Sequence, residues 1–202
     1  MRKGLFITFE GADGCGKTTQ IKLLNSYLLN KGFETLITRE PGAIGLGEKF
    51  REILLNYEGD VSPTCESFLF LADRAQHVDC IIKPALKDGK IILCDRHTDS
   101  TVAYQGYGRG LDLGRINYLN EIATAGLRPD LTIILDVDIE TSMKRVGSER
   151  DRMESAGTDF FNRVRNGYLQ IAKQDPDRVK LISSADTIEN IHKKVVELVE
   201  SL

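Results

Sequence analysis

The sequence predicts one α/β domain built on a five-stranded parallel sheet with helices on both faces. Five short segments alternate with segments whose apolar residues recur at helical spacing. Most of the five are apolar and rich in β-branched residues, as expected for strands buried on both faces of a parallel sheet. The expected strands cover residues 4–9, 35–39, 91–94, 131–136 and 179–182.

Length and composition favour a single domain spanning residues 1–202. A chain of 202 residues buries one large core. Its net charge of −3 argues against a general nucleic-acid or membrane-binding surface. No apolar run approaches the roughly 18 residues of a membrane helix, and the first strand begins too early for a signal peptide. Cys15, Cys65, Cys80 and Cys94 lack C-x-x-C spacing and indicate reduced thiols in a cytoplasmic protein.

A glycine-rich loop separates the first expected strand from the first expected helix, residues 18–31. Its spacing, Gly11-x-x-x-x-Gly16-Lys17-Thr18, is the full phosphate-binding loop pattern. The glycines let backbone N–H groups approach an anion, and the helix N-terminus adds positive charge. Lys17 suits the β- and γ-phosphates and Thr18 suits Mg²⁺. We therefore expect a nucleoside triphosphate to bind Gly11, Ala12, Asp13, Gly14, Cys15, Gly16, Lys17, Thr18 and Thr19.

Charged side chains follow the second and third expected strands. Pro41 forces Glu40 out of helical geometry, and Arg51 projects from the next helix. The third strand runs into Asp95-Arg96, where an aspartate suits Mg²⁺ and an arginine suits a phosphate. Because open α/β sheets bind ligands at the carboxyl ends of their strands, Glu40, Arg51, Asp95 and Arg96 are candidate site residues.

A long helix is expected to begin at Ser62-Pro63, which is a capping residue followed by a proline at the first helical position. Its apolar positions Phe68, Leu69 and Leu71 are expected to pack against the domain.

Phe70 and the polar residues Arg74, Gln76 and His77 suit a planar base, because the ring stacks while polar groups hydrogen-bond the edge of the base. For this segment alone, a core phenylalanine beside an Asp73–Arg74 ion pair is slightly favoured.

The last third of the sequence contains a charged run at residues 144–159. Such a run is usually a solvated loop, but an enzyme that transfers a phosphoryl group also needs an arginine-bearing lid that excludes water. Before it, Asp136 and Asp138 follow the fourth strand and favour a helix cap near residue 139. After it, helices are expected over 160–172 and 187–202, and residues 183–186 lie where an adenine pocket is possible.

Two classes of function compete: a kinase with a small acceptor, and a GTP-hydrolysing switch. The sequence has no guanine-reading N-K-x-D motif, and Arg51, Arg74 and Arg96 indicate a second anion site. A phosphate monoester has a second pKa near 6, so it needs positioning and charge neutralisation rather than a general base. The residues therefore predict a nucleotide-type monophosphate kinase and leave its base open.

Several blocks of residues along nearly the whole chain form a family pattern. They are Phe9-Glu10-Gly11-x-Asp13-Gly14-x-Gly16-Lys17-Thr18-Thr19-Gln20, Thr38-Arg39-Glu40-Pro41-Gly42, Leu69-Phe70-Leu71-Ala72-Asp73-Arg74-Ala75-Gln76-His77, Asp95-Arg96-His97-x-Asp99-Ser100, Ala103-Tyr104-Gln105-Gly106, Pro129-Asp130-Leu131, Leu135-Asp136 and Phe160-x-x-Arg163-Val164-Arg165-x-Gly167-Tyr168-Leu169. With these blocks the chain resembles bacterial thymidylate kinases. The resemblance implies a P-loop kinase fold and direct in-line transfer from ATP to dTMP, with Mg²⁺, giving ADP and dTDP for dTTP biosynthesis. It also implies a homodimer with no nucleic-acid or membrane partner. A kinase for dUMP or UMP remains the alternative.

The resemblance also implies roles for the acceptor residues. Phe70 would stack on thymine, Arg74 would donate to its O4, and Thr101 and Gln105 would line its edge. Arg51 and Arg96 would hold the acceptor phosphate. On the sugar, Asp13 would accept the 3′-hydroxyl and Tyr104 would exclude a 2′-hydroxyl.

On the donor side, the resemblance implies that Glu40 and Asp95 organise the metal and that Arg145 lies against adenine. The phosphate-binding loop has no arginine at its variable positions, which in this family goes with a catalytic arginine from a lid, here at about 145–158. Arg150 is the first candidate and Arg152 the second.

Three departures from the family pattern stand out. Ala43-Ile44 replaces the usual Gly-Thr, His97 stands where tyrosine or phenylalanine is commoner, and the lid is short. The short lid leaves the choice among Arg145, Arg150 and Arg152 open. None of the departures removes a residue that the chemistry requires.

Overall fold

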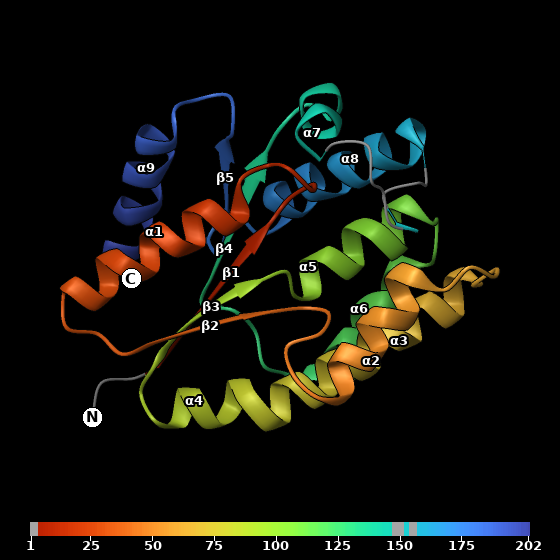
Figure 1. The fold of residues 1–202 in the computed structure, drawn as a ribbon, viewed down its shortest axis with the longest axis horizontal. Helices are drawn as coiled ribbons and strands as arrows, with labels where there is room; N and C mark the ends of the chain where they lie inside the picture. The colour runs from red at the N-terminus through yellow and green to blue at the C-terminus, as the bar shows by residue number, and fades with distance from the viewer. Residues whose placement is uncertain (1–3, 147–151, 154–156) are drawn as a thin grey trace.

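The computed structural model describes residues 4–146, 152–153 and 157–202, and its five strands form one parallel sheet (Figure 1). The strand order is β2-β3-β1-β4-β5. The predicted sheet is confirmed, although the first, third and fifth strands end one residue later than expected. The strands are β1 Leu5–Glu10, β2 Thr35–Arg39, β3 Ile91–Asp95, β4 Leu131–Asp136 and β5 Val179–Ser183.

Helices connect the strands, and several begin where the sequence predicts. Ser62 accepts a hydrogen bond from the Cys65 N–H at 3.3 Å, and Asp138 accepts one from the Thr141 N–H at 2.8 Å, so both predicted caps are confirmed. The helices are α1 Lys17–Asn30, α2 Leu46–Asn56, α3 Pro63–His77, α4 Lys83–Lys87, α5 Thr98–Thr101, α6 Leu113–Thr124, α7 Ile139–Val146, α8 Thr158–Gln174 and α9 Ile188–Glu200, with π-helical segments η1 Val78–Ile82 and η2 Val102–Gly108.

Both faces of the central strands are covered. On one face, Ile7 and Leu93 belong to a core that includes residues of α1 and α9, which lie side by side in Figure 1. On the other face, Phe6 and Ile92 pack with η1, and Ile134 packs with α8. Alternate residues of a strand point to opposite faces, so continuous apolar strands supply both cores at once.

The edges of the sheet differ from the expectation of full burial. Ile37 on β2 is 45% exposed and Leu181 on β5 is 46% exposed, because each of these strands has a neighbour on one side only. The expected packing of Phe68 is also wrong, since its side chain is 53% exposed while Leu71 is buried. Helical spacing alone does not distinguish the buried side of α3 from the side that faces outward.

The parallel register brings the functional loops together. Asp95 pairs with Phe9 on one side and with Arg39 on the other. Glu10 ends β1, Glu40 follows β2 and Arg96 follows β3, so all three lie at one edge of the sheet. This is the edge at which α/β sheets bind ligands. The described residues include no helix that is long and apolar enough to span a membrane.

Candidate active site

A cleft of about 300 Å³ opens at this edge of the sheet. Residues from the phosphate-binding loop, β2, α2, α3, β3 and η2 line it. Most of the predicted acceptor and metal residues meet here, namely Asp13, Thr18, Glu40, Arg51, Phe70, Arg74, Asp95, Arg96, Thr101, Tyr104 and Gln105. The convergence of these distant segments supports the prediction of one two-substrate site.

The glycines of the phosphate-binding loop have positive φ angles, which glycine adopts more readily than other residues. Gly14 and Gly16 have φ angles of 73° and 100°, and Gly16 caps α1 in a left-handed conformation. A Cβ atom on Gly11 would lie 2.4 Å from the Leu135 carbonyl oxygen. The Lys17 ammonium donates to the carbonyl oxygens of Gly11 and Ala12 at 3.2 and 3.1 Å. The loop thus holds a buried cation beside the N-terminus of a helix, an arrangement suited to anionic phosphates.

Arg96 lies opposite the loop and is fixed by several partners. Its Nη2 contacts the Asp13 carboxylate at 2.8 Å and the Tyr104 hydroxyl at 3.1 Å, and its guanidinium lies 5.0 Å from the centre of the Tyr104 ring. Burial alone would raise the pKa of Asp13, but Arg96 and Lys17 lower it to about 2. Arg96 has a φ of 71°, a conformation that costs about 1–2 kcal/mol for an L-residue. The network sustains this strain and orients the guanidinium in the cleft.

A buried carboxylate, Glu10, is linked to Arg96 through the hydroxyl groups of Ser100 and Tyr168. Glu10 was not predicted as a site residue from the sequence. Its Oε1 accepts from the His97 N–H at 2.7 Å, and its Oε2 accepts from Ser100 and Tyr168 hydroxyls at 2.5 and 3.0 Å. Ser100 and Tyr168 in turn accept from Arg96 at 3.1 and 3.2 Å. Burial raises the pKa of Glu10 to about 7. Glu10 and Tyr168 both lie in blocks shared with the family, which was the signal available.

Arg74 is almost wholly buried, with 1% of its surface exposed. Its Nε donates to Glu40 at 2.8 Å, and its Nη atoms donate to Thr101, Asn120 and the His97 carbonyl at 2.8, 2.6 and 2.9 Å. The Asp73–Arg74 ion pair considered for this segment is therefore wrong: Arg74 pairs with Glu40, whereas Asp73 accepts from the Gly42 N–H at 3.1 Å.

Glu40 is the centre of this buried network. Its Oε1 accepts from His77 Nδ1 and His97 Nδ1 at 2.8 and 2.9 Å. Burial alone would raise the pKa of Glu40, but the Arg74 charge and the histidines hold it well below the usual range. His97, which departs from the family pattern, is therefore a hydrogen-bond partner of Glu40. Burial also lowers the pKa of His97.

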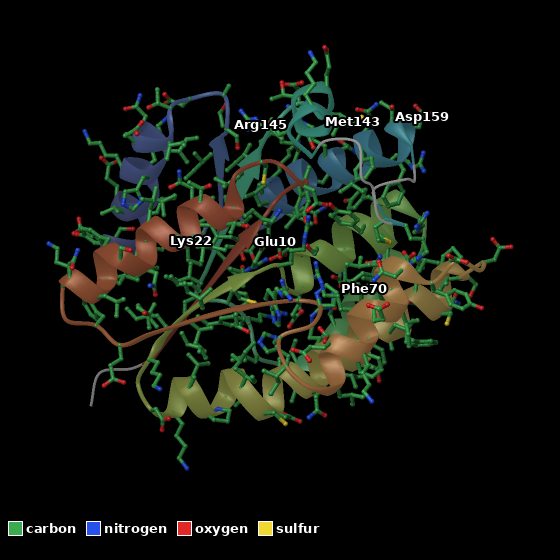
Figure 2. All side chains as sticks on the ribbon, in the orientation of Figure 1. Glu10, Lys22, Phe70, Met143, Arg145 and Asp159 are labelled. Carbon is green, nitrogen blue, oxygen red and sulfur yellow. The ribbon has the colours of Figure 1, made fainter. Side chains whose placement is uncertain are left out.

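Two of the residues predicted to hydrogen-bond the edge of the base, Gln76 and His77, lie outside the cleft. His77 contacts Glu40 and Thr38, and Gln76 contacts Cys80, so neither lines the cleft. Phe70, which Figure 2 labels on α3, does line it, together with Gln105. The Gln105 amide donates to the buried carboxylate of Glu66 at 3.0 Å. An aromatic ring and oriented polar groups thus form the end of the cleft away from the loop.

The donor set near the loop fits Mg²⁺. The Oδ1 atom of Asp95 is buried and has no hydrogen-bond partner among the described residues, and Thr18 lines the same cleft. No cluster of three histidine, cysteine or acidic residues in the described ranges is arranged for a metal. Mg²⁺ in kinases takes one or two protein oxygens, with phosphate oxygens and waters completing its shell, so this sparse set suffices.

The candidate arginines have different surroundings. Arg51 donates to the Pro41 carbonyl at 3.0 Å and lines the cleft. Arg145 is exposed and donates to the Gly14 carbonyl of the loop at 3.3 Å. Arg152 donates to the Leu54 carbonyl and contacts the buried Glu66 carboxylate at 2.8 Å. Arg150 lies outside the described residues.

The phosphate-binding loop and the arginines that face it suit an ATP-dependent nucleoside monophosphate kinase. The thymidylate kinase family profile matches residues 9–195. The chain is 48% identical to a thymidylate kinase of Geotalea daltonii over 97% of this chain and 96% of the relative, and 47% identical to one of Thermoanaerobacter sp. over 98% of both. The crystal structure of thymidylate kinase from Ehrlichia chaffeensis matches with a TM-score of 0.82 and 38% identity, covering 99% of this chain and 100% of that chain. The chain belongs to the thymidylate kinase family.

Proposed function

We propose that the cleft binds dTMP opposite ATP and that the chain transfers the γ-phosphoryl group of ATP to dTMP, giving dTDP and ADP. Family membership supports this reaction. The observation that carries the site assignment is the convergence of cations on one cleft. Arg51, Arg74 and Arg96 line the cleft together with Phe70. Asp13 of the loop lies between two cations, because its carboxylate is 2.8 Å from Arg96 and 3.9 Å from the Lys17 ammonium. The cleft thus offers separate places for the donor phosphates, the acceptor phosphate and a base.

In this proposal the acceptor is positioned by groups that are already fixed. Arg96 and Arg51 hold its phosphate, Asp13 accepts from the 3′-hydroxyl, and Tyr104 occupies the space of a 2′-hydroxyl. Phe70 stacks on thymine, with Arg74, Thr101 and Gln105 at its edge. The acceptor phosphate is largely ionised at neutral pH, so direct in-line attack requires alignment and charge neutralisation, not a general base.

The donor side uses the loop backbone from Gly11 to Thr19 and Lys17. Thr18 and Asp95 would hold Mg²⁺, which supplies charge neutralisation at the β- and γ-phosphate oxygens. Glu40 acts on the acceptor side through Arg74, since both of its carboxylate oxygens are bonded to buried side chains. Arg145 donates to the Gly14 carbonyl of the loop, and this position supports our assignment of Arg145 to adenine. Arg150 remains our candidate catalytic arginine, because the contacts of Arg152 with Glu66 and Leu54 hold that side chain on α2 and α3.

We further propose that residues 1–202 form one domain with a lid at about 145–158 and that two copies associate. The exposed apolar side chains Phe68 on α3 and Tyr118 and Ile122 on α6 lie on helices that pack together. A second copy would cover this surface, and light scattering would then report the mass of two chains rather than one. The cytoplasm is the proposed compartment, because all four cysteines are free and cysteines stay reduced there.

A panel of nucleoside monophosphates tests the reaction. With ATP and Mg²⁺ in excess, we expect dTMP to give the highest kcat/KM, followed by dUMP, with UMP and dCMP far lower. Release of ADP and formation of the diphosphate are both measured. A different best acceptor would overturn the assignment of dTMP, and no acceptor-dependent turnover would overturn the kinase reaction itself.

A further inference from the structure

Arg74 donates one of its hydrogen bonds to Asn120, which belongs to helix α6. Asn120 lies near the end of α6, is 5% exposed, and accepts from Arg74 Nη1 at 2.6 Å. Its amide nitrogen donates to the Thr98 carbonyl at 3.3 Å. Among the described residues, none from α6 lines the cleft. Asn120 therefore reaches the site only through Arg74 and through α5.

The hydrogen bonds of Arg74 leave little freedom for its guanidinium. A guanidinium has five N–H donors in one plane. Four of them donate to Glu40, Thr101, Asn120 and the His97 carbonyl, so one N–H on Nη2 has no partner among the described residues. Both hydrogens of Nη1 are bonded, one to Thr101 on α5 and one to Asn120 on α6. Together with the His97 carbonyl on Nη2, these two acceptors fix the orientation of the guanidinium plane.

We propose that Asn120 is a positioning residue that sets the specificity for the acceptor base, an inference that rests on the proposed binding of dTMP. By holding Nη1, Asn120 directs the one remaining Nη2 hydrogen toward the cleft, where it donates to the carbonyl at C4 of a pyrimidine. A base with an amino group at C4 presents a donor at that point and leaves both donors unpaired.

Asn120 also lines a second cavity of about 540 Å³ between α6 and the start of β5, with Asn117 and Arg178. Without the Asn120 carbonyl, one Nη1 hydrogen of Arg74 would lose its protein acceptor, and water from this cavity would be the alternative partner. The bonds to Glu40, Thr101 and the His97 carbonyl would remain. The guanidinium would therefore be held less firmly, and its Nη2 hydrogen would be less well aligned with the base.

Two variants of similar volume separate positioning from packing. Asn120→Leu fills the space but accepts no hydrogen bond, whereas Asn120→Asp keeps an acceptor beside Arg74. We expect Asn120→Leu to raise the KM for dTMP about tenfold, since a hydrogen bond to a charged group is lost, with kcat and the KM for ATP within about twofold. The preference for dTMP over dCMP in kcat/KM should fall by a similar factor. Asn120→Asp should recover both quantities to within about threefold of the wild type.

The matched control is Asn117→Leu, which changes an exposed asparagine of the same helix and the same second cavity. It should leave both KM values and the preference unchanged. If Asn120→Leu does not fold, Asn120→Ala makes the same comparison with Asn120→Asp. The proposal would be overturned if Asn120→Leu left the KM for dTMP unchanged or raised the KM values for dTMP and ATP equally. It would also be overturned if Asn120→Asp were as impaired as Asn120→Leu. Turnover of dTMP by the wild type tests the proposed function separately.

Discussion

Replacing Lys17 with methionine is expected to lower kcat by about 10³-fold, because removing one preorganised group that stabilises transition-state charge costs this much in other enzymes. Methionine keeps an unbranched side chain of similar length without the charge. In the structure the Lys17 ammonium is bonded to two loop carbonyls and is 6% exposed, so it stands at the place where donor phosphates would bind. Steady-state turnover with saturating ATP and dTMP measures the loss.

Lys22→Met is the matched control. Lys22 lies on α1 one turn beyond the loop and is exposed (Figure 2), so its replacement should change kcat by less than about twofold. Thermal unfolding of both variants would show whether the fold is retained. A folded Lys17→Met enzyme with more than about a tenth of wild-type kcat would contradict the role of Lys17 in transfer.

Replacing Glu40 with glutamine is expected to lower the free energy of unfolding by about 3–5 kcal/mol. The change leaves the Arg74 guanidinium charged and buried without its counter-ion, which is the costly way to break a buried ion pair. Glu40 is 4% exposed and Arg74 is 1% exposed, so water screens neither group. Urea denaturation at neutral pH measures the loss.

The control for Glu40 is Glu52→Gln on α2, an exposed carboxylate that accepts from Asn56, with an expected change within about 0.5 kcal/mol. The pKa of Glu40 is held well below its usual range, with Arg74 the main cause opposing burial. A depressed pKa contributes stability above the ordinary carboxyl range that is lost as the pH falls toward the folded-state value. The gap between wild type and Glu40→Gln should therefore narrow in acid. If Glu40→Gln lowered the free energy of unfolding by less than about 1 kcal/mol at neutral pH, the role of Glu40 as the counter-ion of Arg74 would be contradicted.

The parts of the site that sequence predicts well are local in the chain. The phosphate-binding loop needs fixed residues within eight positions, so spacing alone identifies it. Asp95 and Arg96 follow directly from the end of an apolar strand, and the edge of a parallel sheet brings them to the loop. Arg51 and Arg74 are predicted from their own neighbours in the chain, the loop after the second strand and Phe70, and both line the cleft.

Sequence cannot predict which hydrogen-bond donors pair with which acceptors when the two residues lie far apart in the chain. Arg74 meets Glu40 across 34 residues and Asn120 across 46, and no periodic pattern encodes such pairs. For this reason the sequence of the segment predicts a local ion pair between Asp73 and Arg74, and it predicts no role for Glu10 beyond its place in a strand. Glu66 likewise looks like a first-turn helix residue, yet it is buried and contacts Gln105, Arg109 and Arg152.

The affinity of the protein for dTMP relative to thymidine tests most directly whether Arg96 holds the acceptor phosphate in this cleft. Thymidine lacks only the phosphate, so the ratio of the two dissociation constants isolates that group and cancels any general damage to the site. By calorimetry, we expect the wild type to favour dTMP by about 100-fold or more, and Arg96→Met to reduce this ratio at least tenfold, because charge-assisted bonds to phosphate are lost. An Arg96→Met protein that binds thymidine and keeps the wild-type ratio would contradict the assignment of the acceptor phosphate to Arg96.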